Sequence, residues 1–95
     1  MKVRYRRRAR LDIIDLHAYL EERNPRAATE VVARIRLAID RLGRWPYIGH
    51  AGRAAGTYEW VVTGLPYVIV YEVREASSEI DVVAILHGAR KRPEE

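Results

Sequence analysis

The sequence predicts an α+β domain: an N-terminal strand, a helical hairpin and a three-stranded antiparallel meander that together form one sheet with helices on one face. Three observations support this architecture. Alternating apolar and basic residues open the chain, two stretches with the helical period follow, and three aromatic and β-branched runs occupy most of the C-terminal half. Ninety-five residues suffice for a single domain, residues 1–95, with a thin margin of stability.

The N-terminal strand is predicted from Val3 and Tyr5, which alternate with basic residues as in a strand with one buried side. A helix should follow from about Ala9, because apolar side chains then recur at helical spacing. Its stripe consists of Ala9, Ile13, Leu16, His17 and Leu20.

The second helix is predicted to begin at Asn24-Pro25, where asparagine is a good N-cap and proline fits the first helical position. Gly43 is expected to end this helix. Between them lies a broad apolar stripe, which in so small a domain offers surface to a wrapping partner. The residues predicted to bind that partner are Ala28, Val31, Val32, Ile35 and Ile39.

A glycine-rich loop, residues 43–56, should follow the helices. Its side chains Trp45, Tyr47 and Ile48 are expected to pin the loop to the core. Three antiparallel strands are then predicted, with turns at residues 63–66 and 75–78 between them. Their expected bounds are Tyr58–Val62, Tyr67–Val73 and Glu79–Leu86.

Positive charge is concentrated at the two ends of the chain, although the net charge is only +4. Residues 1–10 contain six basic and no acidic side chains, and Arg90-Lys91-Arg92 form a second cluster. Such clusters attract phosphates or acidic protein segments, but charge on a strand edge also prevents edge-to-edge aggregation. The charges alone leave both interpretations open.

Composition argues against several classes of protein. The absence of cysteine excludes a disulfide framework and thiolate chemistry, and it fits the reducing cytoplasm, where we expect the protein. The N-terminus does not have the pattern of a signal peptide, and the apolar runs are too short to cross a bilayer, so no membrane partner is expected. The three histidines, at positions 17, 50 and 87, are scattered, so neither a metal nor another cofactor is expected.

Two segments carry a family resemblance: GLPYVIVYEV at residues 64–73 and ILHGARKRP at residues 85–93. Together with the helical hairpin before them, they resemble the RelE/ParE family of toxins from bacterial type II toxin–antitoxin pairs, on the ParE side. The resemblance covers essentially the whole chain.

The resemblance implies a toxin that inhibits DNA gyrase by binding, without catalytic residues of its own. It also implies a cognate antitoxin that wraps along the hairpin and the sheet and carries the DNA-binding part, so the toxin would meet operator DNA only indirectly. The stripe on the second helix is therefore expected to bind antitoxin. Target contacts are expected from the basic clusters, of which the first three arginines should share one side of the first strand: Arg4, Arg6, Arg8, Arg90, Lys91 and Arg92.

Cleavage of mRNA on the ribosome, as in the RelE-like branch, is the alternative activity. His87 would then act as general acid or base, and Arg90 and Arg53 would stabilise the phosphate. Family RNases commonly carry an arginine in the strand that matches Tyr67–Tyr71, and here that strand contains no cation. This difference favours the gyrase inhibitor. A third possibility is a degenerate member that binds antitoxin without being toxic.

Overall fold

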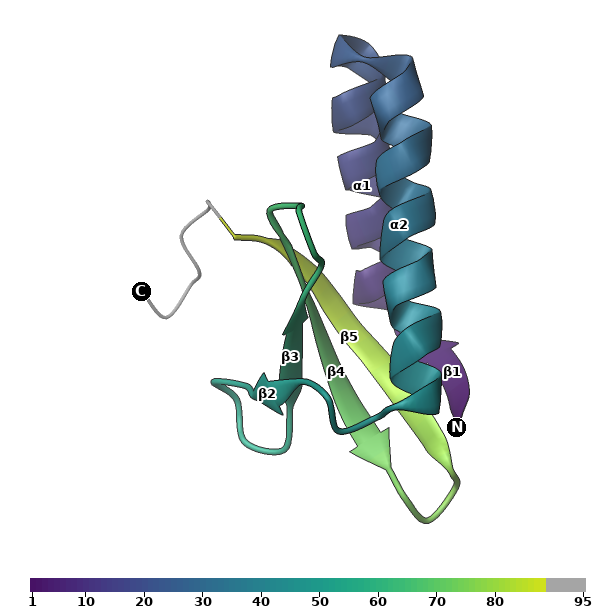
Figure 1. Ribbon diagram of the computed structural model, residues 1–95, viewed down its shortest axis with the longest axis vertical. Coiled ribbons are helices and arrows are strands. Elements are labelled where there is room, and N and C mark those ends of the chain that lie inside the picture. Colours follow the sequence, from purple (N-terminus) through teal and green to yellow (C-terminus); the bar gives the residue numbers. More distant parts are fainter. Residues whose placement is uncertain (89–95) are drawn as a thin grey trace.

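The computed structural model describes residues 1–88 as a five-stranded sheet with a helical hairpin packed against it (Figure 1). This arrangement confirms the predicted α+β class. The basic residues Arg90, Lys91 and Arg92 lie outside the described residues. In chain order the elements are β1 (Lys2–Tyr5), α1 (Arg7–Arg23), α2 (Pro25–Arg44), β2 (His50–Ala51), β3 (Tyr58–Val61), β4 (Tyr67–Arg74) and β5 (Glu79–His87).

The sheet has the strand order β1-β5-β4-β3-β2, so the first strand of the chain lies beside the last (Figure 1). β1 runs parallel to β5, with Val3 opposite Ile80, and the other neighbouring strands are antiparallel. The short strand β2 was not predicted, because two residues are too few to show a period of two. It pairs with the beginning of β3, where His50 lies opposite Glu59.

The two helices meet at Asn24-Pro25, as predicted. The side-chain oxygen of Asn24 accepts a hydrogen bond from the Ala27 amide at 3.2 Å, and Pro25 lies in the first turn of α2. α1 begins at Arg7, earlier than the expected Ala9. Within residues 1–88, neither helix has the length and apolar character needed to cross a bilayer.

The prediction that Gly43 ends α2 was wrong, because the helix continues to Arg44. A Cβ atom on Gly43 would lie 3.0 Å from the Met1 carbonyl oxygen and 3.1 Å from Val3 Cγ2. The glycine therefore allows β1 to approach the last turn of α2. At this point the Met1 ammonium group donates a hydrogen bond of 2.6 Å to the Gly43 carbonyl.

One core lies between the hairpin and the sheet. α2 contributes Ile35, Ile39 and Leu42 to it, and all three side chains are fully buried. The sheet contributes inward-facing side chains from β4 and β5, namely Tyr67, Ile69, Tyr71, Ile80, Val82 and Ile85. The apolar stripe of α2 is thus the part of the hairpin that the sheet covers.

The loop after α2 differs from its predicted role. Trp45, Tyr47 and Ile48 were expected in the core, but 60%, 49% and 39% of their surfaces are exposed. On the sheet side, the core beneath the loop is filled by the ring of Tyr71, which is fully buried on β4. The loop is therefore held by contacts other than the burial of its own large side chains.

Candidate functional site

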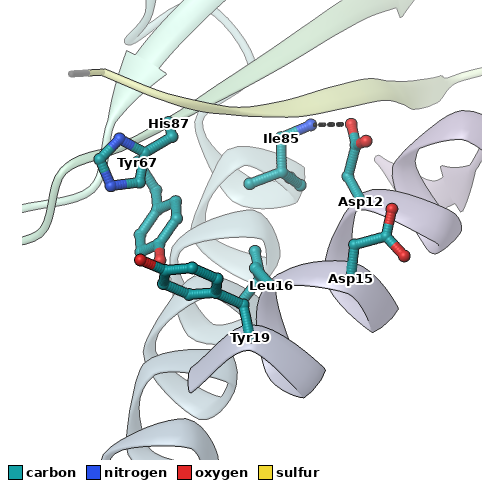
Figure 2. Close-up of a pocket in the computed structure, with 7 residues that line it drawn as sticks. All are labelled: Asp12, Asp15, Leu16, Tyr19, Tyr67, Ile85 and His87. Atoms are coloured by element: carbon teal, nitrogen blue, oxygen red, sulfur yellow. Dashed lines mark hydrogen bonds between the residues drawn. The ribbon is translucent and has the colours of Figure 1, made fainter. Parts of the chain in front are cut away.

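A pocket of 290 Å³ opens between α1 and the sheet, where β5 ends and β4 begins (Figure 2). Its helical lining residues are spaced so that they share one face of α1. The pocket combines three rings with two carboxyl groups, and one of the rings belongs to the predicted catalytic candidate His87. The full lining is Asp12, Asp15, Leu16, Tyr19, Tyr67, Ile85 and His87.

His87 is held at the end of β5 against Tyr67, its register partner on β4. The two rings meet edge to face, with centroids 5.2 Å apart and planes at 85° (Figure 2). Because the Tyr67 side chain is buried, this contact anchors the imidazole to the sheet. Packing therefore accounts for the position of His87 without any catalytic role.

Asp12 connects α1 to β5 at the same pocket (Figure 2). Its Oδ2 atom accepts a hydrogen bond from the Ile85 amide at 2.9 Å and lies 3.5 Å from Arg8 Nε. Asp15, on the next turn of the helix, is exposed. Among the described residues, the lining brings two carboxyl groups and no lysine or arginine to His87. A phosphate transition state requires positive charge, so this lining is poorly suited to cleaving RNA.

Arg53, the other described candidate for RNA cleavage, lies near the opposite end of β4. Its amide donates a hydrogen bond of 3.4 Å to Glu59 Oε2, beside the start of β3. The first residue of β3 lies opposite Tyr71, whereas His87 lies opposite Tyr67. Four residues of extended strand separate these two positions on β4, which amounts to about 13 Å. The fold therefore does not bring Arg53 and His87 together.

Asp81, on β5, is the centre of an ion-pair network that also includes β4 and Arg6, the residue between β1 and α1. Its Oδ2 atom lies 2.7 Å from Arg74 Nε and 3.3 Å from Arg6 Nη2. Arg6 also reaches Glu72 Oε1 at 2.7 Å. The hydrogen bond from Arg74, aided by that from Arg6 and opposed by burial, holds the pKa of Asp81 below its ordinary value of 3.8. Arg6, a predicted target-binding residue, thus already has two acidic partners within the chain.

Arg4 and Arg8, the neighbouring target-binding candidates, also have acidic partners. Arg4 Nη1 lies 3.6 Å from Glu79 Oε2, and Arg8 pairs with Asp12 as described above. The prediction that Arg8 shares one side of the first strand with the other arginines was wrong, because Arg8 belongs to α1. Exposed pairs of this kind add little stability, but they lower the positive potential that a partner would meet. Target binding by these arginines stays a prediction.

The stripe of α2 that was expected to bind a partner faces the core. Ala28, Ile35 and Ile39 have no exposed surface, so the prediction that they contact a partner was wrong for these three. The physical reason is that a domain of this size has one core, and its broadest apolar stripe is buried in it. Val31 and Val32 are half-buried at the edge of the same cluster, and partner binding by them stays a prediction.

The hairpin also exposes apolar side chains that do not belong to the predicted stripes. Leu11, Ile14 and Leu37 are 46%, 61% and 67% exposed. Beside Ile14 lies a groove of 280 Å³, here called the hairpin groove, which is lined by Tyr5, Arg10, Ile13, Ile14 and Arg36. The sequence contains a sign of this exposure in the pair Ile13-Ile14. Consecutive apolar residues cannot both lie on one narrow stripe of a helix, so one of the two had to lie outside it.

Comparison with known proteins assigns the chain to a family. The family model described as the ParE toxin of the type II toxin–antitoxin system parDE matches residues 3–92. This chain belongs to the ParE toxin family. The match includes the hairpin and, except for Pro93, both segments on which the resemblance was based, so that prediction is confirmed. The chain is accordingly a toxin component of a type II toxin–antitoxin system, in the superfamily that includes ParE and RelE.

Two curated relatives are similar in sequence to this ParE-family chain. A protein of Sinorhizobium fredii named "Putative toxin Y4kP" is 33% identical over 93 residues, which is 98% of this chain and 94% of that protein. A protein of Caulobacter vibrioides named Toxin RelE2 is 34% identical over 83 residues, which is 87% of this chain and 90% of that protein. Both relatives are named as toxins, and the second name refers to the RelE branch.

Solved structures show the same fold at lower sequence identity. The chromosomal ParDE toxin–antitoxin system of P. aeruginosa matches with a TM-score of 0.81 at 18% identity, covering 92% of this chain and 95% of that chain. The isolated RelE toxin of E. coli matches with a TM-score of 0.66 at 14% identity, covering 96% and 87%. The toxin chains of both branches therefore share the architecture of this ParE-family protein.

Proposed function

We propose that this ParE-family toxin inhibits DNA gyrase by binding to it and is neutralised by a cognate antitoxin in the cytoplasm. The observation that carries the proposal is the separation of the RNA-cleaving candidates among residues 1–88. His87 shares its pocket with two carboxyl groups, and Arg53 lies near the other end of β4. A toxin that acts by binding needs no such constellation. The match to the ParE family model supports the same choice.

The antitoxin, in this proposal, binds the hairpin groove. The groove has an apolar wall at Ile13 and Ile14 and two cationic side chains, Arg10 and Arg36, beside it. Arg36 lies over the ring of Tyr5, with its guanidinium carbon 5.8 Å from the ring centroid. An amphipathic segment with apolar anchors and flanking acidic residues would complement this surface in shape and charge. Operator DNA would then be contacted through the antitoxin.

The proposal is tested by two assays on the same purified toxin: supercoiling by DNA gyrase and cleavage of mRNA on translating ribosomes. We expect inhibition of supercoiling and no cleavage. His87→Ala should inhibit gyrase as the parent does, because no proton transfer is required, and His50→Ala serves as the matched histidine control. Cleavage by the parent toxin with unaffected supercoiling would refute the proposal.

A ribosome-dependent mRNA endoribonuclease is the second candidate function. It is favoured by the similarity to the protein named Toxin RelE2 and by the histidine that lines a pocket together with Tyr19 and Tyr67. In that case His87→Ala should lower the cleavage rate by about 10²–10⁴-fold, as loss of a general acid or base does. A chain that binds antitoxin but neither inhibits gyrase nor cleaves mRNA would be the degenerate, non-toxic member.

A further inference from the structure

The loop that follows α2 exposes three large apolar side chains within four residues: Trp45, Tyr47 and Ile48. We call residues 45–48 the aromatic loop. Large apolar side chains that gather at an exposed position commonly mark a contact surface, whereas isolated ones need no explanation. Trp and Tyr are also the residues that most often dominate the energy of protein interfaces.

The backbone of the aromatic loop is hydrogen-bonded to the hydroxyl group of Tyr71, a core residue on β4. The hydroxyl of Tyr71 donates a hydrogen bond of 2.7 Å to the Pro46 carbonyl and accepts one of 3.1 Å from the Gly49 amide. The Tyr71 side chain is fully buried, so both bonds are sheltered from water. In addition, the Ile48 amide donates to the Trp45 carbonyl at 3.2 Å and closes a turn.

Ring packing and a glycine fix the same loop from the side. The ring of Tyr47 meets that of Tyr58 at 5.6 Å, and Tyr58 stacks on Tyr71 at 5.5 Å. A Cβ atom on Gly49 would lie 2.6 Å from the Tyr71 hydroxyl and 2.8 Å from the Glu59 carbonyl oxygen, so only glycine allows this approach. The exposed rings are therefore preorganised, which lowers the entropic cost of binding a partner.

The charges around the aromatic loop are balanced. Arg41 and Arg44 lie in the last turn of α2, and Asp40 directly precedes that turn. The hydroxyl of Tyr47 is hydrogen-bonded to the carboxylate of Glu75. A nucleic acid would require a clear excess of cations beside the rings, and Glu75 would repel its phosphates. An apolar protein surface is the occupant that fits an exposed indole, a phenol and flanking arginines.

The aromatic loop also lies apart from the hairpin groove. The groove ends on α2 at Arg36, and Trp45 follows the end of that helix, so nine helical residues, or about 13 Å, separate the two positions. We propose that the aromatic loop is the surface through which this toxin binds its protein target, with the indole of Trp45 entering an apolar cleft of that target. The identity of the target as DNA gyrase rests on the proposed function.

The test compares Trp45→Ala with Val61→Ala, which truncates another exposed apolar side chain, on β3. Both variants are first checked for folding by circular dichroism and for affinity to the antitoxin. Inhibition of purified gyrase and arrest of growth are then measured. We expect Trp45→Ala to bind antitoxin like the parent and to weaken gyrase inhibition and growth arrest by about tenfold or more. Val61→Ala should behave like the parent in every assay.

Failure of this inference can be distinguished from failure of the proposed function. If the parent arrests growth without affecting gyrase, the proposed target is wrong, and growth arrest by Trp45→Ala still tests the loop. Unchanged growth arrest by a folded Trp45→Ala protein overturns the inference. Loss of antitoxin affinity overturns it too, because the loop would then face the antitoxin. The chain also contains Trp60, so a nucleic-acid target is tested by comparing the parent with Trp45→Ala. Salt-dependent quenching of tryptophan fluorescence by a single-stranded oligonucleotide in the parent but not in Trp45→Ala would overturn the inference in favour of a nucleic acid. A parent that arrests no growth and inhibits no gyrase would overturn it as well.

Discussion

Tyr71 illustrates, at the scale of a single residue, which properties the sequence could predict. Its place in an aromatic and β-branched run predicted a strand residue with a buried ring, and the ring is buried. The same pattern could not predict that its hydroxyl holds the backbone at Pro46 and Gly49, because hydrogen bonds between positions more than twenty residues apart depend on the tertiary fold. His87 is a similar case. The sequence singled it out, but its neighbours Asp12 and Tyr19 come from a distant helix.

Tyr71→Phe should destabilise the protein, because it leaves the Pro46 carbonyl and the Gly49 amide without their partner. We expect a loss of about 1–3 kcal/mol in the free energy of unfolding, the usual cost of an unsatisfied buried polar group. Urea denaturation measures this loss. Tyr58→Phe, which removes a hydroxyl from the half-buried ring next to it, is the control and should change stability by less than about 0.5 kcal/mol. Equal losses in the two variants would show that the loop does not depend on the Tyr71 hydroxyl.

Asp81 predicts a dependence of stability on pH. Its folded-state pKa lies below 3.8, chiefly because Arg74 donates a hydrogen bond to it. A carboxyl group with a depressed folded pKa stabilises the fold above its unfolded pKa, and this stabilisation is lost as the pH falls through the folded value. Asp81→Asn should therefore be less stable than the parent at pH 7, and the difference should shrink below about pH 4. Urea denaturation from pH 2 to pH 7, with the exposed Asp15→Asn as control, tests this. A difference that does not vary with pH would contradict it.

At the scale of elements, periodicity identified both helices and the Asn24-Pro25 break between them, because these signals are local. It placed the end of α2 wrongly, because Gly43 is required by the close approach of residues 1–3 and not by the end of the helix. Periodicity also located the apolar face of α2 without revealing what covers it. Burial is decided by the whole fold: the stripe of α2 is part of the core, whereas Ile14 and Leu37 are exposed.

Ile14→Asp should weaken antitoxin binding, because it replaces an apolar anchor of the hairpin groove with a carboxylate, which would pair with Arg10 and Arg36 in place of the partner's acidic residues. We expect an affinity loss of about tenfold or more, measured by calorimetric titration, with a folded variant. Ile35→Asp should instead prevent folding, since that side chain is fully buried in the free protein. Val61→Asp is the exposed control and should bind as the parent does. Unchanged affinity of Ile14→Asp would exclude the hairpin groove as the antitoxin site.

At the scale of the whole molecule, a single core supports a five-stranded sheet in a chain of 95 residues. Small domains bury a modest fraction of their surface, so their stability depends strongly on partners that bind the folded state. The overall architecture was predictable from the order of helical and extended segments, since few arrangements satisfy that order. The pairing of strands from the two ends of the chain, such as β1 with β5, could not be predicted, because sequence periodicity does not show which strands are neighbours.

Addition of the antitoxin should therefore raise the thermal midpoint of this toxin in a concentration-dependent way. At a free antitoxin concentration of a hundred times Kd, the folded state gains about 2.7 kcal/mol by mass action. Differential scanning calorimetry of the complex at several antitoxin concentrations measures the shift. Lysozyme at equal concentration, which has no reason to bind, should leave the midpoint unchanged. A midpoint that is independent of antitoxin concentration would mean that the antitoxin does not prefer the folded toxin.

The pairing of β1 with β5 has a consequence for the order in which a ribosome completes this protein. The hairpin is synthesised early and its contacts are local, so it is able to form while the chain is still growing. Val3 and Tyr5, however, acquire their neighbours only when residues 79–82 have emerged. Until then the nascent chain has helices but no closed sheet, and a translation stop before residue 79 would leave it so. Completion of the sheet therefore depends on residues from both ends of the chain and has to follow the emergence of the last strand.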